Sequence, residues 1–234
     1  QTGNFDDDLQ QLNKCDWIIE VIVERLDIKQ QLFERIEAVR KPGTLITSNT
    51  SGIPIAQLSE GRSEDFQKHF CGTHFFNPPR YLPLLEIIPG PSTNPEVLDF
   101  FTRFGERILG KQVVLCKDTP AFIANRVGVF AIQALFHTVQ DMGLSVEAVD
   151  KLTGPAMGRP KSATFRTCDV VGLDTLVHVA KGVADNCPDD ERREAFEIPS
   201  YVQHLVDHDR LGSKSGAGFY KKVKDEKGKS EILV

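Results

Sequence analysis

The sequence lacks any hydrophobic run that approaches a membrane-spanning helix, which needs about 20 consecutive apolar residues. It has no amino-terminal pattern typical of a secretory signal peptide. Its cysteines form no CxxC pair and no cluster with histidine; they are Cys15, Cys71, Cys116, Cys168 and Cys187. These absences argue against a membrane span and a metal site, and they favour reduced thiols in a cytoplasmic or matrix-like compartment.

An excess of positive charge is also lacking. The chain has 28 Lys and Arg residues against 33 Asp and Glu, which gives a net charge of −5. This balance argues against nucleic acid or an anionic membrane as the main partner. With 234 residues, 40 % of them hydrophobic, the chain can form one large or two small globular domains with a core of their own.

The first half of the sequence alternates short apolar strands with amphipathic helices. The patterns predict strands over 16–23, 44–48, 69–76, 84–88 and 112–116, and helices over 28–39, 55–58 and 94–108. A strand–helix–strand order implies a parallel sheet with a right-handed crossover. The link between the third and fourth strands is too short for a crossover helix, so this pair should be antiparallel.

After Pro120 the pattern becomes helical and stays so as far as Val206. We therefore expect an α/β fold: a partial Rossmann-type doubly wound sheet in residues 1–119, followed by an all-helical domain in residues 120–221. Residues 222–234 should form a polar, lysine-rich and partly disordered tail. This pairing of domains fits several nicotinamide-dependent dehydrogenase families and by itself proves none.

Polar side chains follow three of the predicted strands, at the point where each strand ends. Ligands of open α/β sheets bind beyond the carboxyl ends of the strands. Together these side chains indicate the lining of one crevice, to which the strands contribute Glu24, then the tract 48–51, then His74 and Asn77.

The most informative pair is His74 and Glu86. Each lies in an apolar run, and a carboxylate in such a run is costly unless it has a partner. Antiparallel strands could place the two side by side, so that Glu86 fixes the tautomer of the imidazole and His74 accepts a proton. The alternatives are a core histidine satisfied by a carboxylate, or a Glu86 that faces solvent.

Two further features also have plainer interpretations. The tract Ser48-Asn49-Thr50-Ser51-Gly52 could be a polar turn with a helix N-cap rather than part of a binding site. Asn125 lies in an otherwise apolar stretch, where it could make interdomain hydrogen bonds instead of contacting a substrate.

The order and spacing of these motifs resemble the L-3-hydroxyacyl-CoA dehydrogenases, NAD-dependent enzymes of fatty-acid β-oxidation. The resemblance extends from about Asp7 to Tyr220. It rests on Glu20-Val21-Ile22-Val23-Glu24 with Lys29, Ser48-Asn49-Thr50-Ser51, His74-Phe75-Phe76-Asn77-Pro78, Glu86, Lys117-Asp118-Thr119-Pro120 with Phe122-Ile123-Ala124-Asn125-Arg126, and Gly216-Ala217-Gly218-Phe219-Tyr220.

The resemblance implies a role for each matching residue. His74 would be the catalytic base and Glu86 the residue that orients it. Ser51 and Asn125 would hydrogen-bond the substrate oxygens near the reacting carbon. The nicotinamide half of NAD would contact Glu24, Lys29, Asn49 and Asn77. The implied partners are an acyl-CoA substrate and a second copy of the chain, bound through the helical domain.

The sequence departs from the family pattern at its start, where a strand, a GxGxxG turn and a helix are expected. Gly3 and Gly43 lie in no such turn. We therefore expect this chain to be a piece of a longer polypeptide, in which an enoyl-CoA hydratase-like region could also be present, and to bind NAD weakly by itself.

Two other functions stay open. One is a non-catalytic structural relative with the same fold, which would have no need of His74, Glu86, Ser51 and Asn125 together. The other is a dehydrogenase of sugar acids or β-hydroxyacids, which would resemble a lysine-based site that this sequence does not contain.

Overall fold

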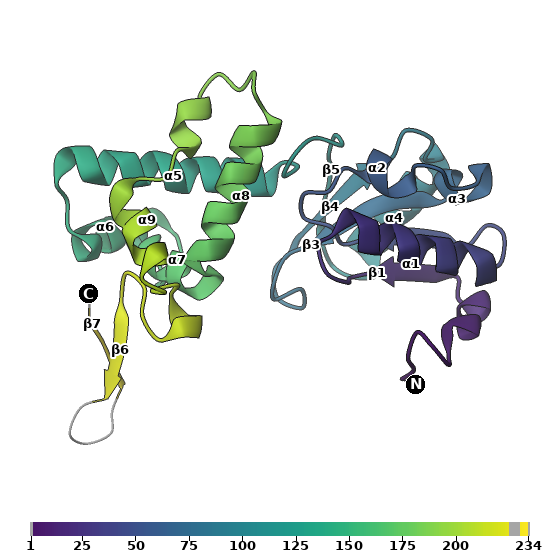
Figure 1. Cartoon of the computed structure of the whole chain (residues 1–234), viewed down its shortest axis with the longest axis horizontal. Coiled ribbons are helices and arrows are strands. Elements are labelled where there is room, and N and C mark those ends of the chain that lie inside the picture. Colours follow the sequence, from purple (N-terminus) through teal and green to yellow (C-terminus); the bar gives the residue numbers. More distant parts are fainter. Residues whose placement is uncertain (1, 225–229, 234) are drawn as a thin grey trace. The chain divides into compact units, whose positions relative to one another are not determined.

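The computed structural model describes residues 2–224 and 230–233. The chain divides into two compact units, Gln1–Ile123 and Ala124–Val234, which are described here one at a time (Figure 1).

None of the helices in the described part of the chain combines the length and the apolar character needed to cross a membrane.

The first unit is built around a five-stranded sheet in the order β1-β2-β3-β4-β5. Its strands are β1 (Trp17–Glu20), β2 (Leu45–Ser48), β3 (Phe70–Phe75), β4 (Leu84–Pro89) and β5 (Gln112–Leu115). Strands β3 and β4 are antiparallel, and the other neighbours are parallel. The predicted α/β class and the predicted antiparallel pair are therefore both confirmed.

Strand β1 ends at Glu20, earlier than the sequence pattern predicts. The backbone N–H of Ile22 donates to the carboxylate of Glu20 at 2.6 Å instead of to a neighbouring strand. A charged side chain therefore ends the strand by competing for the next amide along the chain.

Helices cover both faces of the sheet (Figure 1). Because side chains alternate along a strand, Ile18, Ile46 and Phe70 share one core with α1 (Leu26–Val39) and with the short helices α2 (Ile55–Ser59) and α3 (Glu64–Lys68). Trp17 and Cys71 belong to a second core with α4 (Pro95–Arg107). Helix α3, which begins at the N-cap Ser63, is absent from the sequence prediction.

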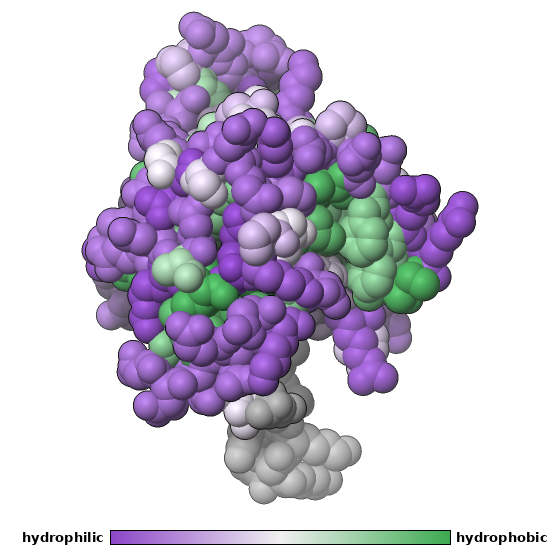
Figure 2. Space-filling view, turned by 90° about the vertical axis from the view of Figure 1, so that its right-hand side faces the viewer, coloured by the Kyte–Doolittle hydropathy of each residue, from purple (hydrophilic) through white to green (hydrophobic). Residues whose placement is uncertain are grey.

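The edge strand β1 and the segment after it expose apolar side chains. Ile19, Val21 and Val23 are all exposed, and among the described residues β1 pairs with β2 alone. Figure 2 shows hydrophobic atoms gathered in a few places on a mainly hydrophilic face. Single exposed apolar residues are normal on a protein surface. The edge strand β1 combines several of them with backbone groups that no described strand pairs on its outer side.

The second unit is mainly helical, as predicted. Its helices are α5 (Ala124–Met142), α6 (Val146–Thr153), α7 (Phe165–Val171), α8 (Leu173–Asn186) and α9 (Ser200–Asp207), with short 3-10 turns η2 (Pro155–Met157), η3 (Arg193–Phe196) and η4 (Ser213–Ser215). The structure then pairs β6 (Lys221–Lys224) with β7 (Ser230–Leu233), where the sequence indicates a polar tail. The rest of that tail, 225–229 and 234, lies outside the described residues.

The motif at 216–220 closes this unit on a buried carboxylate. Asp169 accepts the backbone N–H groups of Phe219 and Tyr220, each at 2.9 Å. A Cβ atom at Gly218 would lie 2.0 Å from Asp169 Oδ1, which no relaxation of a buried side chain could absorb. The glycine at 218 is therefore needed for the close approach of backbone to carboxylate.

Candidate functional site

His74 and Glu86 face each other across the antiparallel strands β3 and β4, where the register pairs the two residues directly. His74 Nδ1 lies 2.8 Å from Glu86 Oε2, and the two residues are only 3 % and 1 % exposed. The other carboxylate oxygen, Oε1, accepts the backbone N–H of Ile123 at 3.1 Å. Glu86 is thus a buried, hydrogen-bonded carboxylate, and the interpretation in which it faces solvent is wrong.

Aromatic rings enclose this pair. The ring centroids of Phe76 and Phe122 lie 4.4 and 5.7 Å from that of the His74 imidazole. Apolar surroundings lower the local dielectric, which strengthens the interaction between an imidazole and a carboxylate. The enclosure therefore makes Glu86 an effective partner for a proton held on His74.

The second nitrogen of His74 meets the turn that follows β2. Ser51 Oγ lies 3.2 Å from His74 Nε2. If Nδ1–H donates to Glu86, Nε2 is the unprotonated nitrogen and accepts the hydroxyl hydrogen of Ser51. The hydroxyl of Ser51 thus occupies the position from which a substrate hydroxyl would also reach Nε2.

Glu24 holds the turn that carries Ser51. Its Oε1 accepts the Thr50 hydroxyl at 2.6 Å, the Ser51 N–H at 2.8 Å and the Gly52 N–H at 3.2 Å. Partial burial raises the pKa of Glu24, but the Thr50 hydroxyl, the Ser51 amide and Lys29 outweigh it and hold that pKa below the ordinary value of 4.5. The tract 48–52 is thus a polar turn, and it also faces His74.

Lys29 is 1 % exposed, which is unusual for a lysine. Its ammonium lies 2.7 and 2.9 Å from the two oxygens of Glu20, 3.2 Å from the carbonyl of Ile22 and 3.3 Å from Glu24 Oε2. Glu20 was given no role in the sequence analysis, although it lies in an apolar run as Glu86 does. The cost of a charge in such a run was the signal that could have found it.

Asn49 and Asn77 differ in their surroundings. Asn49 Oδ1 accepts the backbone N–H of Phe75 at 2.9 Å, which ties the end of β2 to β3. Asn77 is exposed in the segment after β3. Asn125 belongs to the second unit, in the first turn of α5, so its place at the site stays a prediction.

Asp118, near the end of the first unit in the sequence, binds the start of α2, just after the turn that carries Ser51. Its two carboxylate oxygens accept the backbone N–H groups of Ile55 and Ala56 at 2.8 and 2.9 Å, at the start of α2. A carboxylate at a helix start satisfies orphan amides and complements the helix dipole. In the sequence, Asp118 stands out only as part of a motif, and its contact with α2 was not predicted.

Neither a reactive thiolate nor a metal centre is found at this place among the described residues. Burial and the nearby Glu86 raise the pKa of the Cys116 thiol to about 12, so this cysteine stays protonated. No group of three or more potential ligands among the described residues could hold a metal ion.

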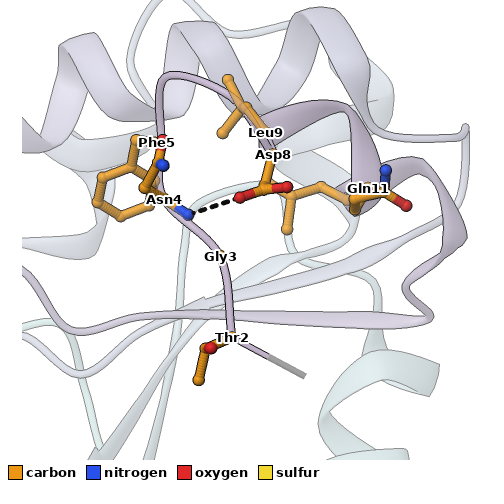
Figure 3. Close-up of a pocket in the computed structure, with 8 residues that line it drawn as sticks. Thr2, Gly3, Asn4, Phe5, Asp8, Leu9 and Gln11 are labelled. Atoms are coloured by element: carbon orange, nitrogen blue, oxygen red, sulfur yellow. Dashed lines mark hydrogen bonds between the residues drawn. The ribbon is translucent and has the colours of Figure 1, made fainter.

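A hollow also lies between the first residues and the 3-10 turn η1 (Leu9–Lys14), where the N–H of Asn4 donates to Asp8 (Figure 3). Its lining residues come before β1 in the sequence. The hollow therefore lies near the amino-terminal ends of the strands, whereas His74 lies near the carboxyl end of β3. None of the predicted site residues lines it; the lining residues are Thr2, Gly3, Asn4, Phe5, Asp8, Leu9, Gln11 and Leu12.

Comparison with known proteins agrees with the resemblance seen in the sequence. Residues 1–119 match the family model of the 3-hydroxyacyl-CoA dehydrogenase NAD binding domain, and residues 122–222 match that of the 3-hydroxyacyl-CoA dehydrogenase C-terminal domain. The chain belongs to the 3-hydroxyacyl-CoA dehydrogenase family. Members of this family are NAD-binding oxidoreductases.

Similar curated proteins are known from bacteria. A probable 3-hydroxyacyl-CoA dehydrogenase of Bacillus subtilis is 55 % identical over 94 % of this chain, and one of Deinococcus radiodurans is 50 % identical over 98 %. The chain spans 28 % of the first protein and 65 % of the second. The solved (S)-3-hydroxybutyryl-CoA dehydrogenase of Ralstonia eutropha shares the fold, with a TM-score of 0.83 and 27 % identity over 92 % of this chain and 74 % of that one.

Several polar side chains around His74 are accessible to a ligand. Glu24, Ser51 and Asn77 are exposed at the carboxyl ends of the strands, where open α/β sheets bind nucleotides. Their carboxylate, hydroxyl and amide groups can hydrogen-bond a ribose and a carboxamide. Within the described residues, the link from β1 to α1 contains no glycine, so the amide cradle for a pyrophosphate is not provided there.

Proposed function

We propose that the protein containing this chain oxidises a (3S)-3-hydroxyacyl-CoA reversibly to the 3-oxoacyl-CoA, with NAD as the hydride acceptor. One observation carries the proposal: buried His74 is bonded through Nδ1 to buried Glu86, while its Nε2 meets a hydroxyl group. Alcohol oxidation needs a base at the hydroxyl proton, and this arrangement supplies one.

The geometry supports the roles proposed for His74 and Glu86, and the family resemblance supports those proposed for Ser51 and Asn125. Glu86 keeps the proton of the neutral imidazole on Nδ1, so Nε2 is free to take the hydroxyl proton of the substrate. The positive charge that then forms on His74 is stabilised by the adjacent carboxylate. Ser51 and Asn125 donate hydrogen bonds to the substrate oxygens near the reacting carbon.

When bound, NAD would accept the hydride from the carbon that bears the hydroxyl group, while the hydroxyl oxygen gives up its proton. Glu24, Asn49 and Asn77 would hold its nicotinamide half, and the buried Lys29 would support it through its contact with Glu24. We further propose an acyl-CoA substrate, a homodimer formed through the helical unit and a cytoplasmic location, because the enzyme family and the reduced cysteines favour them.

A non-catalytic structural relative is the second candidate. The costly burial of Glu86 beside His74 disfavours it, because replacing a buried charged pair with apolar residues is often neutral or stabilising. A protein selected only for its fold would have no reason to keep this pair.

The deciding experiment measures NADH consumption with acetoacetyl-CoA, for this chain and for the product of the intact gene. His74→Ala should lower kcat in the intact product by about 10²–10⁴-fold, the usual contribution of a general base. His69→Ala is the matched control, because His69 precedes the same strand at its other end and its imidazole Nδ1 contacts Asp65 in α3, away from the site. The control should retain activity and thermal stability.

If His74→Ala keeps its activity, the base is another group and the roles of His74 and Glu86 must be withdrawn. If the intact product is inactive with native residues, the structural relative becomes the better explanation.

A further inference from the structure

We propose that Glu20 is a positioning residue of this site: it holds Lys29 and Ser48 so that Glu24 and the turn 49–52 present Ser51 to His74. The link from Glu20 to Ser51 rests on hydrogen bonds within the first unit. Its consequence for catalysis rests on the proposed function.

The first route from Glu20 runs through Lys29. Glu20 binds the ammonium of Lys29 with both oxygens, while Glu24 meets it with Oε2 alone, at 3.3 Å. Glu24 Oε1 is therefore left for the hydroxyl and the two amides of the turn. Without Glu20, the buried ammonium would need another counterion, and Glu24 is the nearest carboxylate to it in the described contacts.

The second route runs through Ser48. Ser48 Oγ donates to Glu20 Oε2 at 2.5 Å and accepts the backbone N–H of Thr50 at 3.2 Å. A hydroxyl that donates to a carboxylate has its lone pairs fixed in direction, so Glu20 also orients the acceptor for the turn. The two routes meet at residues 50–52, on either side of the Ser51 hydroxyl.

Charge and burial explain why a carboxylate is needed at position 20. The side chains of Glu20 and Lys29 are 0 % and 1 % exposed, so water cannot replace either partner. Glu24 is 41 % exposed and could turn toward solvent or toward Lys29. Because Glu20 already neutralises the ammonium of Lys29, Glu24 can keep its hydrogen bonds to the turn.

The first test is amide hydrogen exchange of the full chain, which needs no NAD and no turnover. In Glu20→Gln, exchange at Ser51 and Gly52 should rise by about tenfold, the effect of weakening a hydrogen bond to a charged group. Glu37→Gln is the matched control, because Glu37 on α1 accepts the Ser63 N–H at 2.8 Å away from the site. It should speed exchange at Ser63 and leave Ser51 and Gly52 unchanged.

Ser48→Ala is the second variant, since it interrupts one route without uncovering a buried charge. It should also speed exchange at Ser51, and it decides the question alone if Glu20→Gln does not fold. Unchanged exchange at Ser51 and Gly52, or a uniform rise across the whole chain, would overturn the proposal.

The second test is a double-mutant cycle on kcat/KM in the intact gene product. Glu20→Gln should lower kcat/KM, and this penalty should vanish in a Ser51→Ala background, because the turn then has no hydroxyl to position. Additive effects would show that Glu20 does not act through Ser51. If His74→Ala were fully active, the proposed function would fail while the exchange result still stood.

Discussion

Three carboxylates organise the polar groups of the site, and each is satisfied in a different way. Glu86 meets an imidazole and a backbone amide, Glu20 meets an ammonium and a hydroxyl, and Glu24 meets a turn. Burying a charge without such partners costs several kcal/mol. The fold can therefore hold Glu20 and Glu86 in its interior only because each has donors built around it, while Glu24 is partly exposed.

At this scale the pH dependence of Glu24 can be predicted. The folded state holds the pKa of Glu24 below 4.5, so the stabilisation is present above pH 4.5 and is lost as the pH falls through the folded-state pKa. Glu24→Gln removes it. Urea unfolding at pH 7 should show a loss of about 0.5–1 kcal/mol, a small value because the side chain is partly exposed. The loss should shrink as the pH falls through the folded-state pKa, and a loss that stays equal at acid pH would contradict the assignment.

At the scale of elements, α2 is positioned by a missing side chain. Gly72 lies in β3, where an added Cβ would come within 2.9 Å of Ile55 on α2 and 3.0 Å of Ile88 on β4. Helix α2 follows directly on the turn that carries Ser51. The absence of a side chain at Gly72 therefore lets the Ile55 side chain of α2 pack directly against β3.

Gly72→Ala should destabilise the protein by about 1–3 kcal/mol, the usual cost of overpacking a core. Urea unfolding measures this change, which arises because the side chains of Ile55 and Ile88 must repack. Gly182→Ala in α8 is the control. Its Cβ would meet nothing within 4 Å, so it should gain about 0.5–1 kcal/mol from helix propensity. An unchanged free energy of unfolding in Gly72→Ala would mean that the side chains of Ile55 and Ile88 make room for the methyl group without cost.

At the scale of the whole molecule, the affinity of this chain for NAD can be predicted. Exposed polar groups lie near His74, but the link from β1 to α1 has no glycine-rich turn for the pyrophosphate. By itself, this chain should therefore bind NAD with a Kd well above the micromolar range. Isothermal titration calorimetry of the chain and of the intact gene product would measure both affinities. Easy saturation of the chain by micromolar NAD would contradict this expectation.

Local patterns in the sequence determined most of the fold. Apolar periodicity located α1, α4 and the strands of the sheet, and the short link between β3 and β4 required an antiparallel pair. The same reasoning led to Glu86, because a carboxylate inside an apolar run must have a partner nearby. These signals lie within a few residues along the chain, so they can be read without the tertiary structure.

The tertiary structure decided which groups meet. Glu20 is 28 residues from Ser48 and Ser51 is 23 residues from His74, and no local pattern states such pairings. The physical reason is that propensity and periodicity act over a helical turn or a strand, whereas the sheet register brings distant polar atoms within hydrogen-bond distance.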